Sequence, residues 1–174
     1  DLVARRSAAR GARCAVERLS AKQTKGAASE ALHALAEACG PSWVVSVVRE
    51  ACVAHKNPKV MLEGLLWARE AVEAFGIPSI HPKVPIGFGV TKVCTDHATK
   101  DVRDAAIALV LSVRKAVGPL VLTLPQVQGM REPAKKQLKA ESDKLDAAGT
   151  CALPPPSKAF KHAAAPAAAA GTGG

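Results

Sequence analysis

Aromatic residues are scarce in this chain: of its 174 residues only 3% are Phe or Trp, and tyrosine is absent. β-Sandwiches and β-barrels depend on aromatic and β-branched side chains, whereas filling by Ala and Leu is typical of closely packed helices. Because 48% of the residues are nevertheless apolar, the composition favours an all-α fold with a substantial core.

Long apolar runs and paired cysteines are also missing. No stretch of about eighteen apolar residues occurs, so we expect no membrane-spanning segment and no membrane partner. The cysteines are odd in number, widely spaced and without a C-x-x-C pair, which is typical of reduced thiols in a cytosolic or nuclear compartment. They are Cys14, Cys39, Cys52, Cys94 and Cys151.

No motif for catalysis or cofactor binding is present. The sequence has no Gly-x-Ser-x-Gly, Walker or His-Glu-x-x-His pattern, and Gly87-Phe88-Gly89 lacks the strand and third glycine of a dinucleotide loop. Cys94 and His97, with His81 upstream, fall short of the four ligands of a structural zinc site. We therefore expect no enzyme, no metal and no cofactor.

Acidic residues are outnumbered, 15 to 24 by Lys and Arg, for a formal net charge of +9. The excess lies mostly in residues 1–60. A basic chain of this kind indicates an acidic partner, which the charge alone leaves open among nucleic acid, an anionic membrane and an acidic protein.

What the chain does have is a repeat. Three apolar segments close on Gly40, Gly76 and Gly118, which are 36 and 42 residues apart, and the first and last of these glycines precede a proline. Glycine followed by proline is a common helix stop, because glycine adopts the left-handed conformation at little cost.

Each unit is predicted to be a helix, a polar turn and a second, amphipathic helix. Periods of 36–42 residues with two helices fit HEAT-like repeats, of about 40–47 residues, better than tetratricopeptide repeats of about 34. We expect an α-solenoid over residues 1–149 and a Pro/Ala/Gly-rich linker or disordered tail over 150–174. The predicted helices are 12–20 and 28–39, 43–55 and 60–75, 85–97 and 102–117, and 120–128 and 133–147.

The polar turns predict a basic edge. Stacked repeats bring equivalent turns to roughly 10 Å from one another, and three successive turns carry positive side chains. The candidate binding residues are Lys22, Lys25, Lys56, Asn57, Lys59, Thr99, Lys100 and Arg103. For Arg103 an ion-pair ladder with the neighbouring repeat is an equally weighted role.

The segment Lys56-Asn57-Pro58-Lys59-Val60, followed by Glu63-Gly64-Leu65-Leu66-Trp67, is specific enough to suggest a family. With flanking matches over roughly residues 13–147, it resembles an internal TOG domain of plant and algal members of the microtubule polymerase family. Such a domain is a flat paddle of six HEAT repeats that holds tubulin at the edge formed by its intra-repeat turns. The resemblance implies that this chain covers about the last four repeats.

The resemblance implies tubulin or the microtubule as the partner, with neighbouring TOG domains of the same chain as a second candidate. It implies a role in microtubule polymerisation and dynamics, in the cytoplasm on the microtubule cytoskeleton, with spindle, centrosome and cilium as candidate locations. Trp43 and Trp67 are expected in the core. Two departures predict local irregularity: Pro82, Pro85, Gly87 and Gly89 in one first helix, and Leu124-Pro125 in the last repeat.

Two other functions remain open from the residues. A HEAT-type adaptor or nucleic-acid-binding solenoid could use the same basic edge, although the shortage of aromatics and Arg clusters near the turns disfavours nucleic acid. A TOG domain of a ciliary or rescue-factor type is the other alternative.

Overall fold

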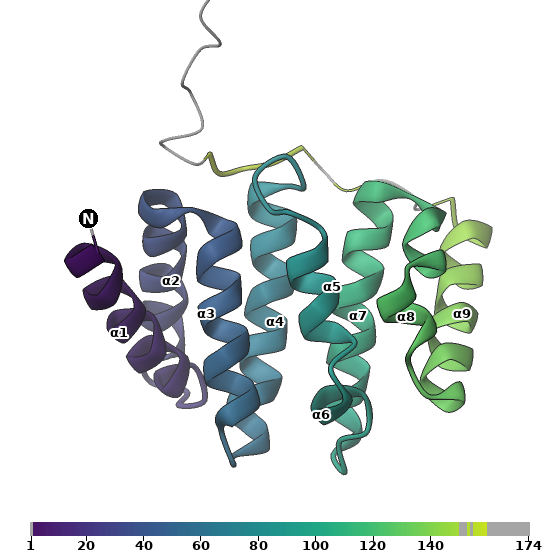
Figure 1. Cartoon of the computed structure of the whole chain (residues 1–174), viewed down its shortest axis with the longest axis horizontal. Helices are drawn as coiled ribbons and strands as arrows, with labels where there is room; N and C mark the ends of the chain where they lie inside the picture. The colour runs from purple at the N-terminus through teal and green to yellow at the C-terminus, as the bar shows by residue number, and fades with distance from the viewer. Residues whose placement is uncertain (1, 150–152, 154, 160–174) are drawn as a thin grey trace, which may run out of the picture.

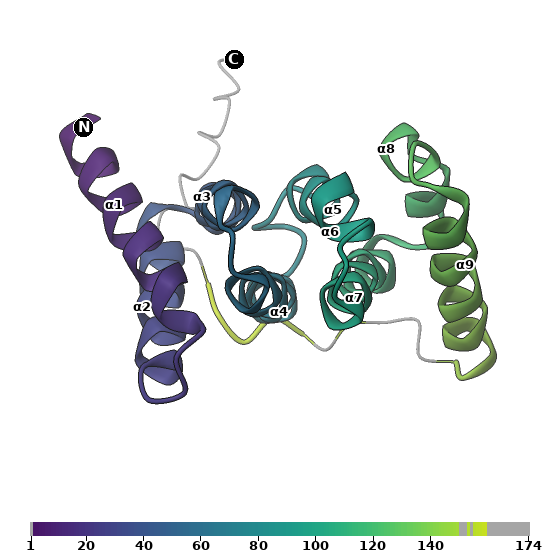
Figure 2. The same cartoon turned by 90° about the horizontal axis from the view of Figure 1, so that it is seen from below.

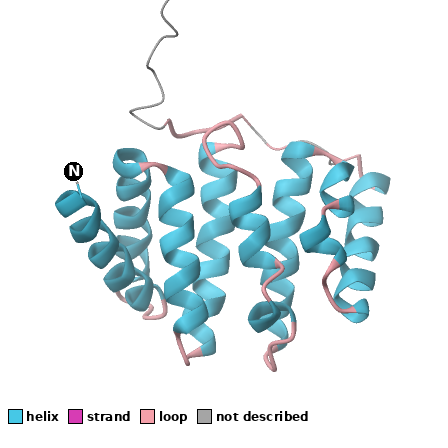
Figure 3. Ribbon diagram, in the orientation of Figure 1, coloured by secondary structure: helices cyan, strands magenta, loops and turns pink. Residues whose placement is uncertain are grey.

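The computed structural model describes residues 2–149, 153 and 155–159, and within these residues it contains helices and no strand (Figure 3). The first four helices are α1 (Leu2–Leu19), α2 (Lys25–Cys39), α3 (Pro41–Ala54) and α4 (Pro58–Phe75). The others are α5 (Lys83–Gly89), α6 (Lys92–Thr95), α7 (Lys100–Val117), the 3-10 helix η1 (Pro119–Thr123), α8 (Pro125–Gln128) and α9 (Glu132–Ala147).

These elements form four helical pairs that stand side by side, which confirms the predicted all-α solenoid (Figure 1). Seen along the helices, α3 and α5 lie in one layer and α4 and α7 in the other (Figure 2). The turns inside the pairs lie at the lower edge of Figure 1, and the connections between pairs lie at the upper edge.

The predicted glycine stops are confirmed at three helix ends. Gly40, Gly76 and Gly118 have φ values of 100°, 72° and 99°, in the region that favours glycine. The N–H of each donates to the carbonyl four residues back, at 3.1, 3.0 and 2.7 Å. The same backbone device therefore ends the second helix of three successive repeats.

The core is formed by the apolar stripes of both helices of each repeat, and the second helices contribute many of its residues. Leu65, Val72 and Leu109 have no exposed surface. Trp67 is 2% exposed, and Trp43 is half-buried against the core. The sequence predicted both tryptophans in the core, which is confirmed for Trp67, whereas Trp43 packs against the core at its margin.

Several expected boundaries are wrong, among them the element 120–128, which is divided into η1 and α8 at Leu124. The helix α1 begins at Leu2 rather than residue 12, and the first turn is 20–24, so Lys25 begins α2 instead of lying in the turn. The expected helix 85–97 is two short helices, because Lys83 already starts α5 and the chain breaks at Val90 and Thr91.

The irregular α5 has a packing reason. A Cβ placed on Gly89 would lie 2.8 Å from the carbonyl oxygen of Ala106 and 2.7 Å from Cγ2 of Val110. Both of these belong to α7, so glycine lets the two backbones approach closely. An ordinary helix-forming residue at this position would have to push α5 away.

The described part of the C-terminal segment makes contacts that its composition did not predict. Leu153 is packed against the core, and the main-chain N–H of Lys158 donates to the carbonyl of Ala74 at 2.9 Å. The division of the chain at residues 149 and 150 stays a prediction, and Cys151, together with everything from 160 onward, lies outside the described residues.

We predict that Gly89→Ala lowers the free energy of unfolding by about 1–3 kcal/mol, the usual cost of overpacking a core. The matched control is Gly11→Ala, since no atom lies within 4 Å of a Cβ at that helical position. This control should gain about 0.5–1 kcal/mol from helix propensity. Urea denaturation of both variants measures the difference, and equal stabilities would contradict the close approach of α5 and α7.

Candidate functional site

Four turns lie along one edge of the solenoid, and we refer to them together as the turn edge (Figure 1). They connect α1 to α2, α3 to α4, α6 to α7 and α8 to α9. The turn edge is made of residues 20–24, 55–57, 96–99 and 129–131.

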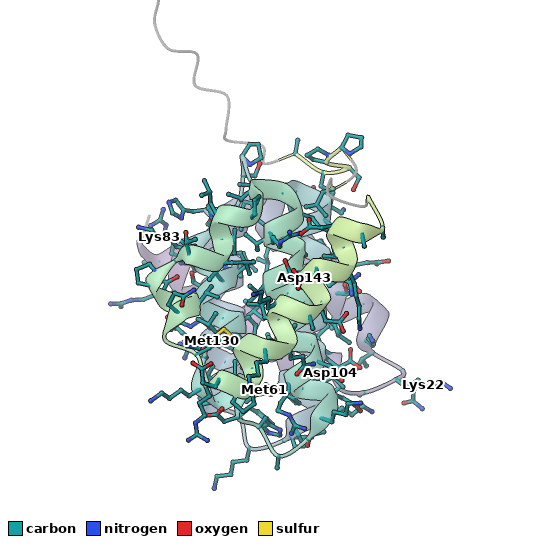
Figure 4. The ribbon with its side chains drawn as sticks, turned by 90° about the vertical axis from the view of Figure 1, so that its right-hand side faces the viewer. Lys22, Met61, Lys83, Asp104, Met130 and Asp143 are labelled. Atoms are coloured by element: carbon teal, nitrogen blue, oxygen red, sulfur yellow. The ribbon has the colours of Figure 1, made fainter. Side chains whose placement is uncertain are left out.

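In the first turn the two predicted lysines have different surroundings. Lys22 is exposed and its side chain points away from the body of the molecule (Figure 4). Lys25 reaches across to the next repeat, where its Nζ lies 2.6 Å from Oε2 of Glu63. The side chain of Glu63 is only 12% exposed, so Lys25 neutralises a nearly buried carboxylate.

In the second turn, Asn57 caps α4. Its Oδ1 accepts a hydrogen bond from the N–H of Lys59 at 2.9 Å, which satisfies one of the unpaired donors at the helix start. Lys56 and Lys59 flank this cap, and both side chains are exposed. Asn57 therefore shapes the turn that presents the two lysines.

In the third turn, Arg103 forms hydrogen bonds with the backbone of the turn. Its Nη1 donates to the carbonyl oxygens of His97 at 2.5 Å and Ala98 at 3.0 Å. These partners lie in its own repeat, whereas the sequence offered a ladder to the neighbouring repeat as one of its two roles. Lys100 remains 77% exposed, with Asp104 at 4.0 Å, and Thr99 lies beside it, also exposed.

Contacts between repeats at this edge are made by residues that the sequence did not single out. Arg131 Nε lies 3.0 Å from Asp96 Oδ2, and Gln137 Nε2 donates to Asp104 Oδ1 at 2.8 Å. Together with Lys25 and Glu63 they join successive repeats next to the turns.

Two further groups enlarge the edge. Lys92 is exposed and Val93 is 44% exposed, both on α6, which lies at the turn edge (Figure 1). The expectation of one continuous helix over 85–97 concealed them. Arg131, 71% exposed, directly precedes α9 as Asn57 directly precedes α4, and counting the fourth turn would have found it.

Two histidines occupy equivalent places and fix two of the turns. Nδ1 of His55 accepts the N–H of Asn57, and Nδ1 of His97 accepts the N–H of Thr99, each at 3.0 Å. A backbone N–H can only donate, so Nδ1 of each ring is the acceptor. These histidines thus brace the turns.

The two buried thiols, Cys52 and Cys94, are not reactive nucleophiles. Burial raises the pKa of Cys52 to about 12 and that of Cys94 to about 11, so both remain protonated at neutral pH. In the described part of the chain no group of three or more His, Cys, Asp and Glu residues is placed to hold a metal.

The structure thus brings the predicted residues to one edge but divides them by their contacts. Exposed ammonium groups are presented by Lys22, Lys56, Lys59 and Lys100, whereas the candidate binding residues Lys25 and Arg103 make structural contacts.

Among the helices of the part of the chain that the structure describes, none has the length and apolar character of a membrane span.

The sequence is similar to proteins of a known family. Residues 7–141 match the family model described as "XMAP215/Dis1/CLASP, TOG domain". Protein MOR1 of Oryza sativa is 34% identical over 142 residues, which cover 79% of this chain and 7% of that protein. Centrosomal protein 224 of Dictyostelium discoideum is 28% identical over 135 residues, covering 75% of this chain and 6% of the relative. The chain therefore spans less than a tenth of the length of these relatives.

The fold has a counterpart among solved structures. Drosophila melanogaster Mini spindles TOG3 superposes with a TM-score of 0.73 at 24% identity, covering 84% of this chain and 61% of the other. With the match to residues 7–141, this chain belongs to the XMAP215/Dis1/CLASP family of TOG domains.

Proposed function

We propose that this chain binds tubulin through its turn edge and thereby contributes to microtubule polymerisation and dynamics. The observation that carries the proposal is a row of exposed lysines along one edge, each in a turn or in the first residues of the helix that follows it: Lys22, then Lys56 and Lys59, then Lys100. Such a row of ammonium groups attracts an acidic protein surface and sets its register.

The structural contacts at the edge support the same proposal. The asparagine cap, the two histidines and Arg103 fix the backbone of the second and third turns, so this backbone needs little ordering when a partner binds. Preorganised groups lose less entropy on association. Val93 adds an exposed apolar side chain next to Lys92, which suits a protein partner better than a phosphate backbone.

The proposed function places the chain on the microtubule cytoskeleton in the cytoplasm, with the centrosome and spindle as candidate locations; one relative is named Centrosomal protein 224. A neighbouring TOG domain of the same protein is a further candidate partner for the edge. Binding of nucleic acid through the same lysines would depend steeply on salt and extend over many phosphates.

We predict that Lys56→Glu combined with Lys59→Glu weakens tubulin binding about tenfold, or roughly 1.4 kcal/mol. The fold should survive, because acidic residues at the start of α4 interact favourably with the helix dipole. Co-elution with tubulin in gel filtration at low and at moderate salt measures the effect, since salt screens exposed charges.

The control for this experiment is a pair of single changes. Lys56→Glu and Lys83→Glu alter the net charge equally, and both lysines are exposed next to a helix start, but Lys83 lies away from the turn edge (Figure 4). Only Lys56→Glu should weaken co-elution. An equal loss in both would indicate a general charge effect, and unchanged co-elution of the double variant would refute the proposed edge.

Lys25 and Lys22 are predicted to respond in opposite ways. Lys25→Met should lower the free energy of unfolding by about 1–2 kcal/mol, because Glu63 loses the partner of its nearly buried carboxylate. Lys22→Met should change stability by less than about 0.5 kcal/mol and instead weaken tubulin binding. Thermal denaturation with the same co-elution assay separates the two, and a Lys25 variant as stable as the wild type would contradict the inter-repeat role.

A further inference from the structure

Residues 153 and 155–159 run along the edge opposite the turn edge, and we call them the C-terminal strap (Figure 1). They pass over the ends of the second helices, where the glycine stops lie. Their sequence, Leu153 followed by Pro155-Pro156-Ser157-Lys158-Ala159, is rich in proline and contains no helix or strand.

Lys158 makes two different contacts at one end of the strap. Its main-chain N–H donates to the carbonyl of Ala74 at 2.9 Å, in the last turn of α4, where carbonyls lack partners within the helix. Its Nζ lies 3.1 Å from Oε1 of Glu37 on α2. One residue of the strap thus joins the ends of two helices from successive repeats.

The prolines pack where a side chain would not fit. A Cβ on Gly76 would lie 2.7 Å from Cγ of Pro156, so this proline occupies the surface that the glycine leaves open. The equivalent Gly118 has no atom within 4 Å of the same position. The strap therefore selects the α4 end and not merely any glycine stop.

The other end of the strap lies near α7. Leu153, Pro155 and Pro156 border a shallow hollow together with Lys115 and Ala116 of α7, and Leu153 is packed against the core. An extended segment containing prolines has few conformations to lose when it docks. This makes a short strap an efficient connection across three repeats.

The charge of Lys158 also acts on its neighbourhood. His33 of α2 has its pKa lowered, mainly by burial and secondarily by the nearby Lys158 ammonium, against the opposing effects of the Ser29 carbonyl and the Glu70 and Glu37 carboxylates. His33 can therefore report whether Lys158 is docked.

We propose that the edge opposite the turns is a docking surface for an extended, proline-containing segment, occupied in cis by the C-terminal strap. Bound there, the strap ties α2, α4 and α7 together and holds the angle between repeats. On the proposed function, it would also hold the spacing of the lysine turns on the far edge.

Amide hydrogen exchange of the full chain, without tubulin, tests the docking directly. The amide of Lys158 should exchange at least about tenfold more slowly than that of Ser157, because a hydrogen-bonded amide exchanges only through local opening. Replacing Pro155 and Pro156 by glycine should abolish this difference, while Leu109 in the core of α7 stays protected and shows that the domain is folded. Equal exchange at Lys158 and Ser157 in the wild type would overturn the proposal.

A second readout uses the imidazole of His33. Lys158→Gln should raise the pKa of His33 in NMR titration, because a positive charge is removed, whereas Lys83→Gln should leave it unchanged. No shift in the Lys158 variant would also overturn the docking. If the wild type does not bind tubulin but shows both the slow exchange at Lys158 and the His33 shift, the proposed function is refuted and the docking of the strap is still supported.

Discussion

Leu65, Ala68 and Val72 of α4 have no exposed surface because α3 packs against one side of this helix and α7 against the other. An isolated pair of helices would leave this stripe in water, so each repeat is stabilised only by its neighbours. The remaining features depend on this stacking. It aligns the glycine stops on one edge and the polar turns on the other, and thereby turns a short sequence period into a continuous surface.

The two edges divide the polar work of the molecule. At the turn edge, Lys25 with Glu63 and Arg131 with Asp96 bind repeat to repeat, while other lysines remain exposed for a partner. At the opposite edge, Lys158 joins two helix ends. A positive side chain on a solenoid can thus either join two repeats or stay exposed to bind a partner, and its contacts in the structure distinguish the two roles.

The sequence was sufficient where the causes were local. Gly40, Gly76 and Gly118 end helices for a backbone reason, so the repeats and the edge carrying Lys56 could be predicted. It was insufficient where a distant group decides. The ion pair that engages Lys25 depends on stacking against the next repeat, and the role of Gly89 depends on its close approach to α7. Composition likewise indicated a linker where Pro156 packs.

The proposed binding of tubulin at the turn edge can be tested by a hydrogen-exchange footprint. The full chain is labelled alone and with saturating tubulin, and the exchange of peptides from both edges is compared. The account predicts slower exchange in residues 20–24, 55–59 and 96–100, with the strap at 155–159 unchanged. Protection of the strap edge, with the three turns exchanging as before, would contradict it.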